Sequence, residues 1–352
     1  MTSHPAAEPS PGSSAALSSA PVRWWPVLLA LAGFLVLPLV PTIFVAAAPI
    51  IHTWMLLAGA LAICAALAWW NGGGIWLAGV AAILIVLVVG APLHGVATKY
   101  ALLARGWVLV LAASFGVASL LTPSQGFFPR ALVAVGIATA IGFVVAIASP
   151  GGVSNVHDVT QAELTRRTDA MITFVDRTTS EPEWRKMADQ TPALDSTMVR
   201  SKRALHDIPA QAASLVPALL ALESLAALAL AWAVFHRLPV PGIGPGLGEL
   251  RQFRFNDQLV WGLAVGATIA LLPVFADGRM AGMNLLVFFG ALYLLRGVGV
   301  LSWMARAKWV ATLLIVLTLF GFIVVGALAL GVGVVDTWMD WRSRGARESG
   351  SR

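Results

Sequence analysis

The chain has 352 residues, of which 58% are apolar and only 11% are charged, whereas soluble domains carry roughly 25% charged residues. A water-soluble domain of this composition could not cover its surface, so the composition excludes that class and indicates a membrane protein. The formal net charge of +6 does not indicate nucleic-acid binding, because the cations are scattered over loops and the C-terminal tail instead of forming one basic stripe.

Long apolar runs fill most of the chain after an N-terminal tail. Residues 1–23 are rich in proline, serine and alanine and cannot bury enough apolar surface to fold alone, which predicts a disordered tail. A helix that crosses a bilayer needs about 20 mostly apolar residues. Nine runs approach this length: 24–45, 49–70, 74–91, 107–122, 131–149, 211–235, 258–276, 282–304 and 309–331. The sequence therefore predicts an all-α, polytopic transmembrane helix bundle of eight or nine spans, with eight applying if the proline-broken first run does not cross.

A polar segment separates two groups of predicted spans. The expected parts of the chain are the tail 1–23, transmembrane helices 1–5 in 24–149, an extramembrane segment in 150–210, transmembrane helices 6–9 in 211–335 and a basic tail in 336–352. The extramembrane segment holds nine acids and eight bases between residues 158 and 207, so it is solvated and nearly neutral. Apolar spacing predicts a helix over about 156–178, and a second helix is expected to start at 181–183. We expect a short helical hairpin at the membrane surface, and the alternative is a solvated connector without a partner.

Glycines and tryptophans indicate how the predicted spans pack and where they end. Gly262 and Gly266 form one GxxxG pair, and Gly321, Gly326 and Gly331 form a sparser series; we expect internal packing faces more than dimer seams. Tryptophans near the predicted span ends indicate the head-group level of the bilayer: Trp24, Trp25, Trp69, Trp70, Trp107, Trp261, Trp303, Trp309, Trp338 and Trp341.

Two charged residues lie inside predicted spans. Glu223 is midway along 211–235, and Arg296 is two thirds along 282–304. A charge at this depth costs about 2.5–3.5 kcal/mol on insertion scales and usually faces the bundle interior. The helical rise places the two residues at roughly 18 and 21 Å from the same membrane side, so we predict that they interact. The pair is interpreted either as a buried ion pair that sets helix register or as a site for substrate or protons, and Arg296 has the further alternative of reaching the nearer interface.

No catalytic or cofactor signature is present in the sequence. HExxH, GxxxxGK[ST], GxSxG and CxxC patterns do not occur. The four glycines within 242–248 lie beside Pro241 and Pro245 and follow no strand, so they predict a flexible connector and not a dinucleotide site. No two of the six histidines are spaced for a helical metal pair, and the single cysteine, Cys64, supports neither a disulfide nor a metal cluster. We expect no enzyme activity, no cofactor and no metal.

Three stretches of the second half carry a family resemblance. A span opens on Pro-Ala-Leu-Leu at 217–220 and closes on Phe-His-Arg-Leu at 235–238; Phe-Arg-Phe-Asn-Asp-Gln-Leu-Val-Trp-Gly follows at 253–262, and Gly-Val-Val-Asp-Thr-Trp-Met-Asp-Trp-Arg ends the last span at 333–342. Over about 210–345 the chain resembles the YybS-like family of uncharacterised bacterial membrane proteins. The resemblance implies distant kinship, at the level of fold only, with substrate-binding subunits of energy-coupling-factor vitamin transporters and with the cell-shape protein MreD.

The resembling stretches contain six polar residues that are candidates for helix capping or for a family motif: Arg254, Asn256, Asp257, Asp336, Asp340 and Arg342. Asn256 or Asp257 is expected to cap the seventh span, because their side-chain oxygens can accept hydrogen bonds from free N–H groups at a helix start.

Two classes of function compete. Many spans, a proline-broken first helix and charges at bilayer depth favour a solute-binding or transport-related protein. The alternative is a non-enzymatic scaffold or partner protein in envelope morphogenesis or signalling, which the charged 155–208 segment favours; an intramembrane enzyme is the weakest option. The expected location is the cell membrane, plasma or inner, with many passes. The expected partners are the lipid bilayer, a small-molecule solute and another membrane protein, but no nucleic acid.

Overall fold

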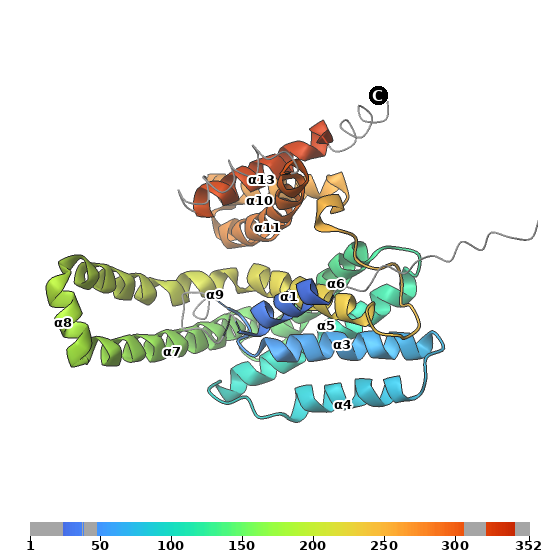
Figure 1. Cartoon of the computed structure of the whole chain (residues 1–352), viewed down its shortest axis with the longest axis horizontal. Helices are drawn as coiled ribbons and strands as arrows, with labels where there is room; N and C mark the ends of the chain where they lie inside the picture. Colours follow the sequence, from blue (N-terminus) through green and yellow to red (C-terminus); the bar gives the residue numbers. More distant parts are fainter. Residues whose placement is uncertain (1–23, 37, 39–47, 306–321, 342–352) are drawn as a thin grey trace, which may run out of the picture.

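The computed structural model describes residues 24–36, 38, 48–305 and 322–341 (Figure 1). Within these ranges the regular structure is helical and contains no β-strand, so the all-α prediction is confirmed for this part of the chain. The predicted N-terminal tail, much of the predicted ninth span and the end of the basic tail lie outside the described residues.

The described residues of the first half of the chain form a bundle of five helices. They are α1 (Trp25–Val36), α3 (Thr53–Trp70), α4 (Trp76–Gly90), α5 (Thr98–Leu121) and α6 (Phe127–Ala148). Helix α4 begins close to the predicted start at residue 74. Helix α5 begins nine residues before the predicted start at residue 107. Its extra turns contain Lys99 and Arg105, and the Arg105 side chain donates a 2.6 Å hydrogen bond to the Ala91 carbonyl at the end of α4. Arg105 is therefore part of α5 and satisfies a carbonyl group at the end of α4, although its charge predicted a loop.

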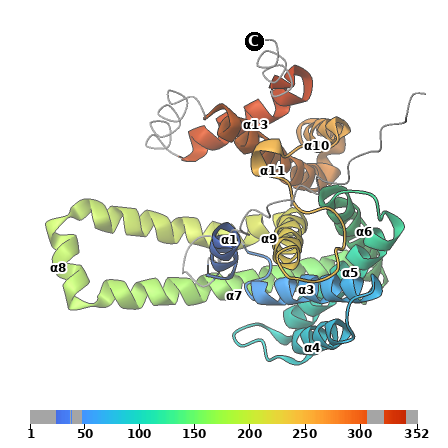
Figure 2. The same cartoon turned by 45° about the vertical axis from the view of Figure 1, so that its right-hand side comes forward.

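The polar segment forms a long helical arm. It consists of α7 (Gly152–Ser180), α8 (Pro182–Gln190) and the first part of α9 (Pro192–Phe235). In both views α7 and α9 lie side by side and extend away from the other helices, with α8 at the tip (Figures 1 and 2). The 29 residues of α7 correspond to about 44 Å of helix. The helices of the arm are longer than the short hairpin expected from the sequence, and α9 continues directly into an apolar helix.

The remaining helices form a second group packed on α9. They are α10 (Val260–Leu271), α11 (Arg279–Met304) and α13 (Phe322–Met339), with short 3-10 turns η2 (Leu250–Gln252), η3 (Asp257–Leu259) and η4 (Pro273–Gly278). Asn284 of α11 joins the two groups. Its amide accepts from Ala218 N at 2.9 Å and donates to Ser214 O at 2.7 Å, beside the Pro217 that interrupts the hydrogen-bond ladder of α9.

Among the residues that the structure describes, five helical segments are long and apolar enough to cross a membrane: Thr53–Trp70, Thr98–Leu121, Phe127–Ala148, Ile208–Phe235 and Pro273–Met304. Shorter apolar helices cover Trp25–Val36, Trp76–Gly90, Asp257–Leu271 and Val324–Met339. A helix of 12 residues is only about 18 Å long, less than the roughly 30 Å hydrocarbon core. The predicted count of eight or nine full spans is therefore not confirmed by the described residues.

Glycines bring several helices into close contact. A Cβ atom on Gly262 would overlap the Phe289 ring, and one on Gly266 would lie 3.2 Å from the Gly282 carbonyl oxygen, so the predicted GxxxG pair lines an internal face between α10 and α11. In the last span the predicted series does not make such contacts: the space around Gly331 is open, and Gly321 lies outside the described residues.

Gly297→Ala is expected to destabilise the detergent-solubilised protein by about 2 kcal/mol. A Cβ at Gly297 would overlap the Ala329 carbonyl, and one at Gly333 would overlap the Tyr293 carbonyl. An added side chain at Gly297 would therefore force α11 and α13 to separate and lose their close packing. The measurement is the midpoint of denaturant unfolding. The control is Gly290→Ala on the same helix, where a Cβ meets nothing within 4 Å; equal effects of both changes would show that close packing at Gly297 is unimportant.

Candidate functional site

Arg296 is the centre of a charge network at the end of the second helix group. This side chain is 3% exposed, and its Nε donates to Asp336 Oδ2 at 3.0 Å while Nη1 donates to Asp257 Oδ1 at 2.6 Å. Nη2 donates to the Asp336 carbonyl oxygen at 3.2 Å, and the guanidinium lies 5.4 Å from the centre of the Phe255 ring. Two carboxylates and an aromatic face therefore surround one buried arginine.

The motif residues singled out from the sequence meet in this network. Arg254 forms an ion pair with Asp340, and Asn256 caps η3 by accepting a 3.0 Å hydrogen bond from Gln258 N. Asp257 pairs with Arg296; Arg342 lies outside the described residues. Two stretches about 80 residues apart thus tie the start of α10 and the end of α13 to Arg296 within α11, an arrangement that can fix helix packing.

The structure does not join Glu223 to Arg296, and the predicted pairing is corrected. Arg296 is held by Asp336 and Asp257, whereas Glu223 Oε2 accepts a 3.1 Å hydrogen bond from the backbone N–H of Ile50. Two residues can pair only if they lie at a similar depth in the membrane and also on helix faces that point toward each other. The packing of α9 and α11 determines these faces, and the sequence positions alone do not.

Glu223 belongs to a second polar site, which we call the backbone clamp. It consists of three side chains from three helices that bind three consecutive residues before α3. Arg167 Nη1 of α7 donates to the carbonyl oxygen of residue 48 at 2.8 Å, Tyr100 of α5 donates to that of residue 49, and Glu223 of α9 accepts from the N–H of residue 50. The Arg167 guanidinium also lies 5.1 Å from the Tyr100 ring centre. The clamp holds non-helical backbone beside a membrane span, where unsatisfied backbone groups are costly.

Glu163 orients the arginine of the backbone clamp. Its carboxylate, which is fully buried, accepts from Arg167 Nε at 2.9 Å, from Arg166 at 2.8 and 3.0 Å and from Ala97 N at 3.1 Å. The pKa of Glu163 lies below its ordinary value: burial alone would raise the pKa, but the hydrogen bonds from Arg166, Ala97 and Arg167 outweigh burial. Glu163 is therefore a charged anchor at neutral pH.

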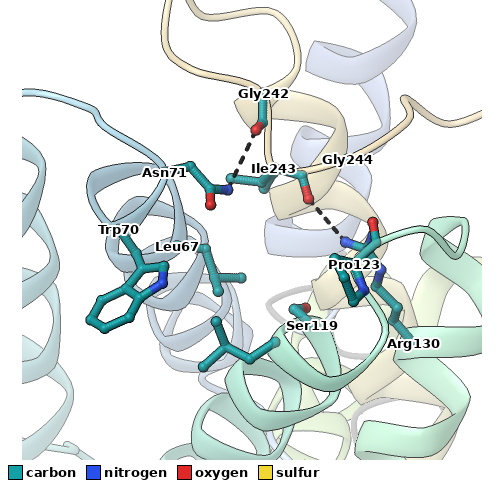
Figure 3. A pocket seen from close by; sticks show the side chains of 10 residues that line it. Leu67, Trp70, Asn71, Ser119, Pro123, Arg130, Gly242, Ile243 and Gly244 are labelled. Atoms are coloured by element: carbon teal, nitrogen blue, oxygen red, sulfur yellow. Dashed lines mark hydrogen bonds between the residues drawn. The ribbon is translucent and has the colours of Figure 1, made fainter.

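A pocket of about 490 Å³ lies at the opposite end of α3 (Figure 3). Its wall is formed by the ends of α3 and α5, the start of α6 and the glycine-rich connector after α9. The lining residues are Leu67, Trp70, Asn71, Ser119, Leu120, Pro123, Arg130, Gly242, Ile243 and Gly244. Arg130 is 1% exposed and is the charged residue of this lining. The pocket thus combines one buried cation with apolar and neutral polar surface.

The glycine-rich connector at this pocket is held in place, in contrast to the predicted flexible connector. Four consecutive carbonyl oxygens, those of residues 242–245, each contact a side chain from elsewhere. Asn71 Nδ2 lies 3.5 Å from the first oxygen, Arg130 Nη1 2.9 Å from the second, His236 Nε2 2.8 Å from the third and Trp232 Nε1 3.1 Å from the fourth. The carbonyl groups of residues 242–245 are therefore satisfied by tertiary contacts.

Several residues of these sites were missed by sequence reasoning. Glu163, Arg166 and Arg167 have the i, i+3 and i, i+4 spacing of helical ion pairs, and this spacing was an available signal. Arg130 precedes a predicted span by one residue, so its position resembled that of an ordinary flanking cation. Tyr100 had no such signal, because its partner is the carbonyl group of a residue 51 positions away.

Metal binding has no support in the part of the chain that the structure describes, since no group of three histidine, cysteine, aspartate or glutamate residues there could hold an ion. No curated protein matches the chain, and no solved structure matches it. A family model described as predicted membrane protein (DUF2232) matches residues 26–337, which include nearly all the helices described above. The chain therefore belongs to the DUF2232 family of predicted membrane proteins, whose apolar helices place it in the membrane.

Proposed function

We propose that this chain is a multi-pass protein of the cell membrane, plasma or inner, that binds a small solute and takes part in its transport without enzyme activity or a cofactor. The observation that carries the proposal is the carboxylate of Glu223, which lies within the span Ile208–Phe235 and binds non-helical backbone instead of a cationic side chain. Transporter sites are commonly built from an ionisable group near the midplane and a break in a helix. The distant, fold-level kinship with energy-coupling-factor subunits that the YybS-like resemblance implies would agree with solute binding, but it names no substrate.

Protonation of Glu223 is the coupled step of this proposal. Oε2 accepts the hydrogen bond from Ile50, while Oε1 makes no hydrogen bond to any described residue, so this oxygen is free to take up a proton. The titratable and charged groups that face Glu223 are Arg167 and Tyr100. A neutral carboxyl group accepts more weakly from an N–H than a carboxylate does. Protonation would therefore loosen one of the three contacts of the backbone clamp and shift segment 48–52 toward a second position.

The test is thiol labelling of segment 48–52 as a function of pH. A cysteine at position 51, Ile51→Cys, is introduced with the buried Cys64 replaced by alanine, and the protein is reconstituted in vesicles. We expect the labelling rate to change between pH 5 and pH 9, whereas Glu223→Gln, a neutral mimic of the protonated carboxyl, should label at one rate throughout.

Two controls separate this effect from other titrations. His52→Gln removes a neighbouring histidine whose pKa is lowered by burial and then by Arg167 and His94, and this variant should keep the pH dependence. Glu249→Gln changes an exposed acid in the connector and should also keep it. An identical pH dependence in Glu223→Gln would contradict the proposed role.

The second candidate function is a membrane scaffold, and the helical arm favours it. The arm extends beyond the rest of the molecule (Figures 1 and 2) and carries polar residues that a partner protein could bind. A membrane partner that co-purifies with the full chain, but not after charge reversal at Asp169 and Arg177 of the exposed face, would favour this function. Stabilisation of the purified protein by a small solute would favour the first.

A further inference from the structure

The pocket at the end of α3 contains a buried positive charge without a described counter-ion. The Arg130 guanidinium donates from Nε to Thr122 O at 3.0 Å, from Nη1 to Ile243 O at 2.9 Å and from Nη2 to the carbonyl oxygen of Pro123. Its other neighbour is the Trp232 ring, 5.6 Å away. In the described ranges, no carboxylate forms an ion pair with Arg130. The three donated bonds use three of its five N–H groups, so two remain available.

A second polar group points to a ligand in the same pocket. The Ser119 side chain is 6% exposed, and its hydroxyl has no hydrogen-bond partner in the described part of the molecule. Figure 3 shows Ser119 between Leu67 on one side and Pro123 and Arg130 on the other. A buried hydroxyl without a partner costs about 1–3 kcal/mol. A ligand oxygen between Ser119 and Arg130 would satisfy both groups.

The wall of the pocket is already in position for a ligand. Arg130 is held by the turn after α5 and by the connector, and Gly244 has φ +142°, a conformation that L side chains rarely adopt. A Cβ at Gly244 would lie 2.9 Å from Arg130 Nη1, so glycine is what lets the connector backbone approach the guanidinium. Little ordering would be needed on binding, which favours affinity.

The rest of the lining is apolar and lies near a membrane interface. Trp70 and Leu120 are largely exposed, at 72% and 55% respectively. Leu67 continues this apolar surface into the pocket. Tryptophan near the end of a span is typical of the head-group level. A ligand that fits would therefore carry an anionic group at Arg130 and an apolar part along Leu67, Trp70 and Leu120.

We propose that this pocket binds an amphipathic oxyanion, with a phosphate or carboxylate group held by Arg130 and Ser119 and an apolar chain on Leu67, Trp70 and Leu120. The site is separate from the backbone clamp, because α3, which is 18 residues long and thus about 27 Å, lies between them. Such a ligand could come from the bilayer, as an anionic phospholipid, or from solution. Guanidinium groups suit either source because they bind phosphate and carboxylate oxygens in pairs.

The test measures binding of two charged probes to the full chain. Protein in phosphatidylcholine nanodiscs is titrated with octyl phosphate, and a parallel sample is compared in nanodiscs with and without phosphatidylglycerol by native mass spectrometry. Octyl glucoside serves as the neutral probe. We expect saturable binding of at least one charged probe, and a Kd about tenfold weaker in Ser119→Ala, since a hydrogen bond to a charged group contributes about 1.5 kcal/mol. Ser119→Leu, which removes the hydroxyl and places a bulky apolar side chain beside Arg130, should abolish binding.

The chain provides a matched control on the same helix. Ser114 is also buried, at 2% exposure, and its hydroxyl also lacks a partner in the described part of the chain, but it does not line the pocket; Ser114→Ala should bind as the parent does. Arg130→Gln should abolish binding, although this change also removes support from the connector. The serine variants therefore test the proposal even if Arg130→Gln does not fold.

Each outcome of the titrations has a defined meaning. Binding of phosphatidylglycerol alone supports a lipid site, binding of octyl phosphate alone supports a site for a soluble ligand, and binding of both supports the shared chemistry. Equal binding of octyl glucoside would overturn the oxyanion part of the proposal. No binding of either charged probe, or binding that is unchanged in Ser119→Leu, would overturn the site and leave Arg130 as a clamp for the connector only.

Discussion

Asp336→Asn is expected to lower the free energy of unfolding of the detergent-solubilised protein by about 3 kcal/mol. Asp336 is fully buried, and its Oδ2 accepts a 3.0 Å hydrogen bond from Arg296 Nε. The change therefore removes the buried negative charge that balances this arginine. The remaining carboxylate partner of Arg296, Asp257, has a side chain that is 60% exposed and offsets less of the cost because water screens it. Loss of one member of a buried pair is strongly destabilising, since the other charge stays without compensation.

A double-mutant cycle measures this interaction directly. Arg296→Gln together with Asp336→Asn should cost less than the sum of the two single changes. Asp340→Asn serves as the control, because its ion pair with Arg254 is about 42% exposed on both sides and should contribute less than about 1 kcal/mol. Additive losses in the cycle would mean that the network around Arg296 does not hold α11 and α13 together.

Glu163→Gln is expected to destabilise the protein at pH 7 by about 3 kcal/mol, because the change leaves the buried Arg167 without its charged partner. The pKa of Glu163 is lowered in the folded state, with hydrogen bonds from Arg166, Ala97 and Arg167 outweighing burial. A carboxyl group with a lowered folded-state pKa stabilises the fold above its unfolded pKa of about 4.3, and this contribution is lost as the pH falls through the folded-state pKa. The difference in stability between the parent and Glu163→Gln should therefore be complete at pH 7 and shrink below about pH 4.

The measurement is the unfolding midpoint of both proteins across a series of pH values. Asp176→Asn provides the control on the same helix, because the Asp176 side chain is 54% exposed and pairs with Lys202 at the surface. Its effect should stay within about 0.5 kcal/mol. A difference between the parent and Glu163→Gln that stays constant from pH 7 to the acid limit would show that ionised Glu163 does not support Arg167.

Local sequence patterns determined the class of the fold. A backbone in lipid must satisfy its own hydrogen bonds, so a long apolar run predicts a helix with little dependence on its neighbours. The predicted run 49–70 therefore agrees with α3, and 131–149 agrees with α6. The helix expected over 156–178 likewise lies within α7, since its apolar spacing is also a local property.

Helix ends and helix continuity depended on tertiary contacts. The sequence predicted the polar segment 150–210 and the span 211–235 as separate parts of the chain, but α9 runs without interruption from Pro192 to Phe235. Two prolines lie inside it, and Asn284 from α11 supplies hydrogen bonds beside Pro217. A residue 67 positions away thus supports a helix that its own sequence would weaken.

The candidate sites were decided almost entirely by the tertiary structure. From the sequence, Glu223 and Arg296 shared a depth in the bilayer, which describes height along a helix axis and not the face on which a side chain lies. Packing turned Glu223 toward the backbone of Ile50 and Arg296 toward Asp336. The sequence by itself therefore determined that the protein is a helical membrane protein with a polar interruption, because hydropathy and helical periodicity are local. Only the tertiary structure decided which charges meet, because those contacts join residues from helices far apart in the chain.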